Sequence, residues 1–269
     1  ASSNKKILSV LCIEKIEDNI LSECAYSLSK QETPVDVLIL TKNLNEEQIG
    51  QIKTIFEKPT IKVVKNNQEG QPVQETIVAE TPINFSIEKT DKSTYPEFFN
   101  EAFNYALING YEFISPIEYD DVLDFKWYKN VLKYSEAKEN VDGFFPITRE
   151  ISGGGFIGFF NEATWAEGLA EVAGFADLQL LLRFNCLNFT GAVYKVNSLK
   201  NYSLEVDGVY KPMKEMIKVS FAYEFFLRMI YNDLKFFTIP RVGYERRIDR
   251  QNSVKSITCK LPRNLSEIP

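Results

Sequence analysis

The sequence contains no histidine and only four cysteines among its 269 residues. Without histidine, the Ser-His-Asp and Cys-His catalytic arrangements are excluded, and a zinc site of the usual Cys/His type is nearly excluded. The cysteines form no CxxC pair, so we expect free, buried thiols at Cys12, Cys24, Cys186 and Cys259. Any general base must therefore be an aspartate, glutamate, lysine, tyrosine or cysteine.

Long apolar runs and an excess of positive charge are also missing. No stretch of 18 apolar residues occurs, so we expect no membrane span. The N-terminal segment, residues 1–6, is short and polar and does not resemble a signal peptide. The sequence therefore predicts a cytoplasmic protein. The 31 basic and 37 acidic residues leave a net charge of −6, which argues against a nucleic-acid partner.

The first half of the chain alternates short apolar runs with segments of helical spacing. These lie at residues 6–13, 17–30, 35–40, 45–56 and 61–64, and Asn45 is placed to cap the second helix. This order predicts a parallel sheet with helices on its faces. Residues 65–94 are more polar and read as an excursion, after which a helix and a buried strand at 111–117 resume the sheet.

The second half is less regular. Four glycines within residues 151–160 suggest a mobile loop or a turn against a ligand. Residues 165–173 and 177–184 have helical patterns, and residues 221–234 form a strongly apolar helix. A short strand at 236–239 then leads into a basic tail, residues 241–250.

The strongest local signal is the tetrapeptide that ends the strand at 111–117. It places Glu118, Asp120 and Asp121 where open α/β sheets bind their ligands. Glu118 and Asp120 are two residues apart and point the same way on an extended segment, which suits a hard divalent cation. The alternative is a solvated acidic turn that caps the helix following it.

Three segments resemble family-2 glycosyltransferases. In residues 100–121 an Asn-led helix runs through GYEF into EYDD, which is similar to the family's D-x-D-D motif with glutamate first. Residues 7–31 resemble its first strand and helix. Residues 221–253 are similar to its E-D-Y-E-F-x-L-R helix and Y-x-x-R-x-H segment. The order and spacing of the three carry the resemblance.

The resemblance implies a GT-A nucleotide-sugar transferase fold, an α/β architecture with a mixed, mostly parallel central sheet flanked by helices. It implies one domain over residues 1–269. Residues 1–124 would form the nucleotide-binding half, and residues 125–269 the acceptor-binding half and C-terminal tail. The reaction would move a sugar, with inversion, from a nucleotide-sugar donor to a hydroxyl of a glycan or another acceptor.

By the same resemblance, a divalent metal, Mn²⁺ or Mg²⁺, would neutralise the leaving nucleoside diphosphate. Asp120 would be its best ligand, with Glu118 as a second. Asp249, which stands at the family's histidine, would be a further ligand.

Donor contacts are implied as well. Asp121 would hold the sugar or the loop, and Arg247 would contact the diphosphate because a guanidinium matches phosphate oxygens. Glu14 would serve near the base or ribose, and Asn100 would bond the nucleotide. The plainer alternatives are a loop residue in solvent for Glu14, a helix N-terminal amide for Asn100, and a solvated basic surface for Arg246, Arg247 and Arg250.

The chain departs from the family at the general base. Phe221 and Ala222 occupy the E-D pair, so no carboxylate stands there. Glu224 and Asp177 are the remaining candidates, with a helix surface or an N-cap as their plainer roles. This gap motivates an alternative function, a degenerate member that binds nucleotide or glycan without turnover. A nucleotidyltransferase is disfavoured because residues 13–16 lack a loop rich in glycine and basic residues.

Aromatic side chains suggest where an acceptor would bind. Trp165 and the aromatic-rich residues 156–160 would form a stacking platform for an acceptor sugar or base. Packing in the core is the alternative for these residues.

Overall fold

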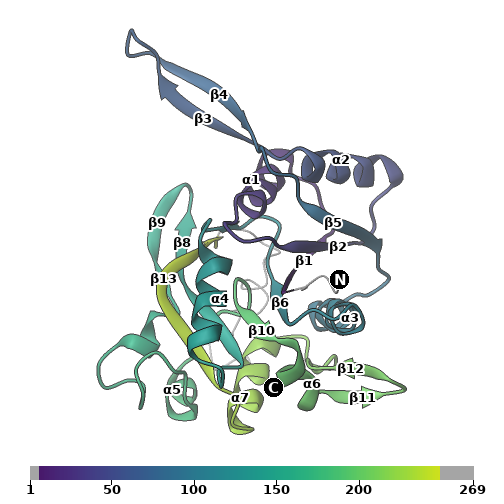
Figure 1. Cartoon of the computed structure of the whole chain (residues 1–269), viewed down its shortest axis with the longest axis vertical. Helices are drawn as coiled ribbons and strands as arrows, with labels where there is room; N and C mark the ends of the chain where they lie inside the picture. The colour runs from purple at the N-terminus through teal and green to yellow at the C-terminus, as the bar shows by residue number, and fades with distance from the viewer. Residues whose placement is uncertain (1–5, 249–269) are drawn as a thin grey trace, which may run out of the picture.

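The computed structural model describes residues 6–248, whose centre is a nine-stranded sheet (Figure 1). One half of this sheet is parallel and consists, in spatial order, of β5 (Asn84–Lys89), β2 (Asp36–Thr41), β1 (Ile7–Ile13) and β6 (Phe113–Pro116). The three inner strands β2, β1 and β6 are buried and rich in β-branched and aliphatic residues, as strands covered on both faces must be, whereas the edge strand β5 is exposed or half-buried.

The other half of the sheet is mixed. Its strands continue the spatial order with β10 (Val193–Lys195), β8 (Gly143–Ser152), β13 (Phe236–Arg247) and β7 (Val122–Leu123). β10 runs antiparallel to both neighbours, whereas β13 and β8 are parallel over most of their length. A hairpin partner, β9 (Gly155–Phe160), pairs with β8. The predicted mixed, mostly parallel α/β sheet is therefore confirmed.

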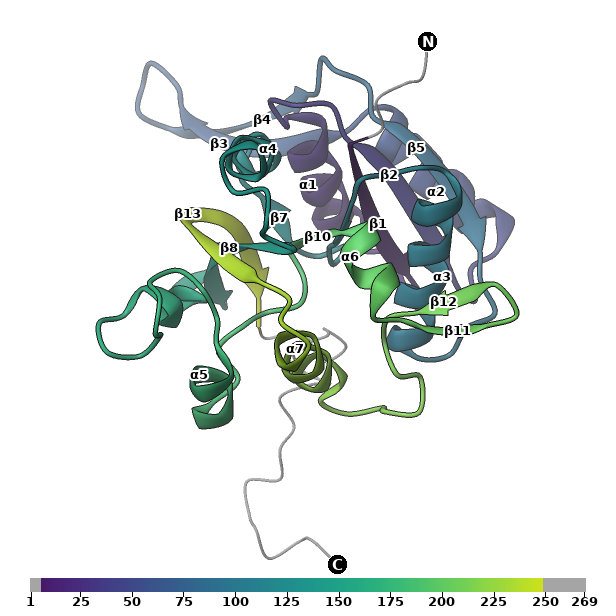
Figure 2. The same cartoon turned by 60° about the horizontal axis from the view of Figure 1, so that its bottom comes forward.

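Helices cover both faces because alternate strand residues point to opposite sides. Ile7 and Leu11 of β1 pack in the core beneath α1 (Asp18–Ser29), α2 (Glu46–Glu57) and α4 (Trp127–Ala137). Leu8 and Val10 pack in the core beneath α3 (Tyr95–Ile108), α5 (Leu178–Arg183), α6 (Val196–Asn201) and α7 (Phe221–Tyr231). Figure 2 shows α1 and α4 on one side of the strands and α6 and α7 on the other.

One sequence prediction about the sheet is wrong. The run at 61–64 does not form its third strand; β3 (Thr60–Asn66) instead pairs only with β4 (Pro72–Val78), and β5 takes the place beside β2. The β3–β4 ribbon projects away from the rest of the chain (Figure 1). Its strands are largely exposed, and they mix short apolar runs with lysine, glutamate and glutamine, unlike the near-continuous apolar runs of the buried strands.

Three further predictions from the second half need correction. Residues 151–160 are not a mobile loop but mostly belong to the paired strands β8 and β9. Gly153 and Gly154, both with positive φ, form the turn between these strands. Residues 166–175 form turns, and only Glu162–Trp165 is helical, as a 3₁₀ turn. Most of the predicted basic tail belongs to β13, which passes Pro240 with a register shift and continues to Arg247.

A short hairpin, β11 (Leu204–Val206) and β12 (Val209–Lys211), completes the elements. The predicted cap of α2 is confirmed, because the Asn45 side chain accepts from the Gln48 N–H at 2.8 Å in a capping box. Within residues 6–248, no helix is both long and apolar enough to cross a bilayer.

The thiols of this fold should be unreactive. Burial is the first cause that raises the pKa of Cys12 and of Cys186 to about 12, and burial also raises the pKa of Cys24 well above its ordinary value, so all three stay protonated at pH 8. We expect the Cys259→Ser variant to show almost no reaction with Ellman's reagent at pH 8, because the thiolate is the nucleophile. The same variant in 6 M guanidinium is the control and should release three equivalents; rapid labelling of the folded variant would contradict the burial.

Candidate functional site

The candidate site lies where the central strand β6 ends. After Pro116 the chain turns through residues 117–121 before entering β7, with the Ile117 N–H bonded to the Val10 carbonyl at 3.0 Å. β6 stands between parallel β1 and antiparallel β10, so this turn occupies the junction of the two halves of the sheet. The carboxyl end of a strand at such a junction is where α/β sheets bind ligands.

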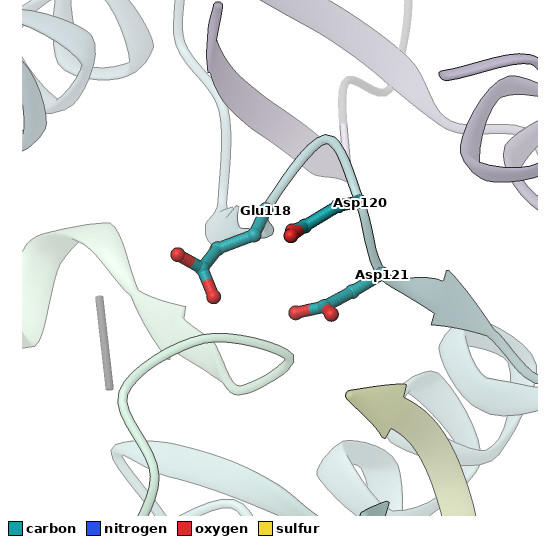
Figure 3. Close-up of side chains that lie close together, drawn as sticks. All are labelled: Glu118, Asp120 and Asp121. Atoms are coloured by element: carbon teal, nitrogen blue, oxygen red, sulfur yellow. The ribbon is translucent and has the colours of Figure 1, made fainter. Parts of the chain in front are cut away.

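Glu118, Asp120 and Asp121 converge at this turn. One carboxylate oxygen of each lies within 4.8 Å of the others. Figure 3 shows the Asp120 and Asp121 carboxylates facing the space that the Glu118 side chain borders on its other side. Glu118 is 9% exposed, Asp120 3% and Asp121 1%, so the tetrapeptide is not the solvated turn of the alternative reading.

The electrostatics of this cluster favour a positive charge. Burial and then the negative charge of Asp120 raise the pKa of Asp121 above its ordinary value. Hydrogen bonds from Tyr244 and from the Arg247 N–H act in the opposite direction and favour the ionised form. Hard oxygen donors at this spacing are what Mg²⁺ or Mn²⁺ prefers, and a bound cation would relieve the like-charge repulsion. The residues present therefore fit a divalent metal.

The last strand of the described chain fixes the cluster in place. The Tyr244 hydroxyl donates to Asp121 Oδ2 at 2.6 Å and accepts the Glu118 N–H at 3.1 Å. The Arg247 N–H donates to Asp121 Oδ1 at 3.0 Å. Both oxygens of Asp121 are thus held by β13, more than 120 residues further along the sequence.

Arg247 lies beside the cluster, and its predicted contact with a diphosphate stays a prediction. Its guanidinium donates to the Asp120 carbonyl at 2.6 Å and forms an ion pair with Glu23 of α1. The side chain is only partly buried. It therefore holds the acidic turn against α1 and keeps a charged group at the rim of the cluster.

The alternative of a solvated basic surface is wrong for Arg246. It is 1% exposed and forms an ion pair with Glu150 of β8. Its guanidinium also bonds Asn188 and lies over the Phe160 ring at 5.1 Å. The charge of Arg246 counteracts the rise in the pKa of Asp121, which places a buried cation behind the carboxylates. The run of charged residues at 245–247 gave no sign of this burial.

The two remaining donor candidates lie on β1 and α3. Glu14 follows β1 and is exposed, and its charge contributes to the raised pKa of Cys12. Asn100 is 2% exposed and pairs with Met213 in both directions, donating to its carbonyl at 2.8 Å and accepting its N–H at 3.0 Å. In the described structure this amide anchors the segment before α7. Its contact with a nucleotide stays a prediction.

The two candidate bases each have protein partners. Glu224 on α7 accepts from Arg228 at 2.8 Å and lies 3.3 Å from the Lys214 ammonium. Asp177 caps α5, accepting the Leu180 N–H at 2.8 Å and the Glu171 N–H at 2.7 Å. The N-cap role for Asp177 is thus present. Asp249, the predicted further metal ligand, lies outside the described residues.

The position of the family's general base is filled by apolar packing. Phe221 and Ala222 are buried, and the Phe221 ring stacks on Tyr95 with centroids 5.4 Å apart. Burial and then the negative charge of Glu118 raise the pKa of Tyr95. A small apolar hollow lies beside it at the ends of β1 and β2, lined by Cys12, Leu40, Tyr95, Phe98 and others.

The predicted aromatic platform is only partly assembled. Phe156 is 53% exposed and Phe159 49%, with ring centroids 5.1 Å apart on the β8–β9 hairpin. Trp165 instead bonds the Thr238 carbonyl at 2.8 Å and packs edge-on against Phe237. Trp165 is nevertheless 40% exposed, so it lies at the edge of the core and not within it, and acceptor binding at the exposed pair stays a prediction.

Comparison with known proteins identifies the fold. No protein-family model matches the sequence, and no curated protein sequence matches it. Among solved structures, residues 1–349 of TarS from S. aureus superpose with a TM-score of 0.60 at 15% identity, covering 90% of this chain and 60% of that one. The complex of TarS 1–349 with UDP-GlcNAc gives a TM-score of 0.61 at 12% identity, covering 93% and 60%.

A longer structure of S. aureus TarS superposes with a TM-score of 0.60 at 13% identity, covering 90% of this chain and 37% of that one. This chain therefore spans 60% or less of the length of these structures. At such low identity the likeness concerns the fold alone. Together with the sheet described above, it shows that the chain has the GT-A nucleotide-sugar transferase fold predicted from its sequence.

Proposed function

We propose that this chain is a nucleotide-sugar glycosyltransferase that uses a divalent cation at Glu118, Asp120 and Asp121. One observation carries the proposal: three carboxylates gather, nearly buried, at the carboxyl end of the central strand. The fold supports it, because TarS, which shares that fold, was crystallised with UDP and with UDP-GlcNAc. The substrates of this chain would be a nucleotide sugar and a hydroxyl-bearing acceptor such as a glycan.

The three carboxylates would have different roles because their surroundings differ. Asp120 and Glu118 would hold Mn²⁺ or Mg²⁺ directly, and Asp249 would be a further ligand. Asp121 is turned toward β13 and would hold the turn and the donor sugar. When bound, the cation would neutralise negative charge that builds on the leaving diphosphate.

The remaining donor contacts follow from position along the sheet edge. Arg247 stands beside the cluster and would meet the diphosphate oxygens. Glu14 follows β1 on the same edge of the sheet and would lie near the base or ribose, with Asn100 of α3 as a further nucleotide contact. This arrangement lets the chain orient a donor whose anomeric carbon faces the acceptor-binding half, residues 125–269.

A second candidate function is binding of a nucleotide sugar without turnover. A specific observation favours it, because buried Phe221 and Ala222 stand where the resemblance expects the general base. Titration calorimetry with UDP- and GDP-sugars plus Mn²⁺, followed by a nucleotide-release assay, separates the two functions. Tight binding with no nucleotide released over hours would select the binding protein.

The metal site is tested by the Asp120→Ala variant. We expect it to lose Mn²⁺-dependent binding of the nucleotide-sugar donor, because it removes the central hard-oxygen ligand. Calorimetry with and without Mn²⁺ measures the effect, and circular dichroism checks that the fold is kept. The Asp124→Ala variant is a matched control, since Asp124 is an exposed carboxylate three residues from the cluster. Unchanged Mn²⁺ dependence in a folded Asp120→Ala protein would remove the assignment.

The general base is tested by the Glu224→Gln and Asp177→Asn variants. Asparagine caps a helix as well as aspartate does, so the second variant keeps its structural role. Because both carboxylates are engaged by protein groups, we expect each variant to keep nucleotide release within about twofold of the parent. Loss of a true base lowers rates by about 100-fold or more. A fall of that size in either variant would identify the base.

A further inference from the structure

A single hydroxyl joins the two ends of the acidic turn. Tyr244 Oη donates to the Asp121 carboxylate at 2.6 Å and accepts from the Glu118 backbone N–H at 3.1 Å. These two residues are the first and last members of the cluster. A group bonded to both sets the distance between them, and with it the width of the space that a cation would occupy.

The ring that carries this hydroxyl has little freedom to move. Tyr244 is 1% exposed and lies on β13 between β7 and β8, in register with Leu123 and Thr148. One side of the ring rests on Gly191, whose φ is +84° and where an added Cβ would come within 2.6 Å of the ring. Gly191 is fixed in turn, since its N–H bonds the Pro116 carbonyl and its carbonyl accepts the Trp127 indole, both at 2.9 Å.

The cluster is thus held by β6, by β13 and by a glycine that lets the ring approach closely. We infer that Tyr244 is a positioning residue for the divalent-cation site, acting through Asp121 and the Glu118 backbone without touching the ion. This inference rests on the proposed function and adds a residue to it. A Tyr244→Phe change keeps the ring against Gly191 and removes only the oxygen that joins the two ends of the turn.

Groups that position a metal site change its affinity when they are lost, because the turn that carries the ligands is no longer held in place. We therefore expect the Tyr244→Phe variant to bind Mn²⁺ about 10-fold more weakly than the parent chain. A loosened site also loses its preference for the small, octahedral Mg²⁺ over the larger, more adaptable Ca²⁺. The ratio of Mg²⁺ to Ca²⁺ affinity should fall, which lower stability alone would not cause.

The experiment titrates the full chain with Mn²⁺ alone, followed by water-proton relaxation, and then displaces Mn²⁺ with Mg²⁺ or Ca²⁺. The matched control is Tyr128→Phe, which also removes a fully buried hydroxyl, one that bonds Ser9 and Ser115 away from the turn. We expect this control to keep the Mn²⁺ affinity and the Mg²⁺ to Ca²⁺ ratio of the parent. Thermal unfolding of both variants establishes that the folded protein is being measured.

Each outcome of the titrations supports or overturns the role of Tyr244 or the proposed function. Weaker Mn²⁺ binding with a lower Mg²⁺ to Ca²⁺ ratio in Tyr244→Phe, and neither change in Tyr128→Phe, supports the inference. Equal affinities and ratios in all three proteins overturn the role of Tyr244 and leave the proposed function standing. Absence of Mn²⁺ binding by the parent chain overturns the proposed function, and this inference with it.

Discussion

The site depends on the repulsion among carboxylates that the fold brings together and removes from water. Three acidic groups with oxygens within 4.8 Å cannot all be ionised and nearly buried without compensation. The protein supplies part of that compensation through Tyr244, the Arg247 N–H and the buried Arg246. A cation could compensate the negative charge that remains. The arrangement therefore favours positive charge at one point on the sheet edge.

The two halves of the sheet contribute different parts of the site. The parallel half delivers the acidic turn by ending β6 at Pro116, and its neighbours β1 and β2 offer their carboxyl ends to the same edge. The mixed half contributes the residues that hold the turn, because β13 lies alongside β7 at the point where the turn ends. A ligand at this edge would contact groups from both halves.

Much of this was predictable from the sequence. Continuous apolar runs identified β1, β2 and the strand before the acidic turn, and alternating helices gave the α/β class. Glu118, Asp120 and Asp121 share a short segment, so their proximity followed from local geometry. Arg247 came from the resemblance; it lies beside Asp120, and its contact with a diphosphate stays a prediction.

What escaped prediction depends on pairing between distant segments. The run at 61–64 has the composition of a strand, but strand composition does not specify a partner, and β5 took the place beside β2. Arg246 and Arg247 are adjacent in sequence, yet only the pairing of β13 with β8 buries one of them against Glu150. The ring of Tyr244 meets Gly191 across a gap in sequence that no local pattern spans.

β13 has one more consequence, for the order in which the molecule becomes competent. The acidic turn is complete early in the chain, whereas the strand that restrains it begins only at Phe236. Closing so long a loop is entropically costly and slow compared with forming local helices. During synthesis, the carboxylates therefore lack their hydrogen bonds to β13 and stay hydrated until nearly the whole described chain has emerged. Competence for a ligand arrives late, together with the docking of the final strand.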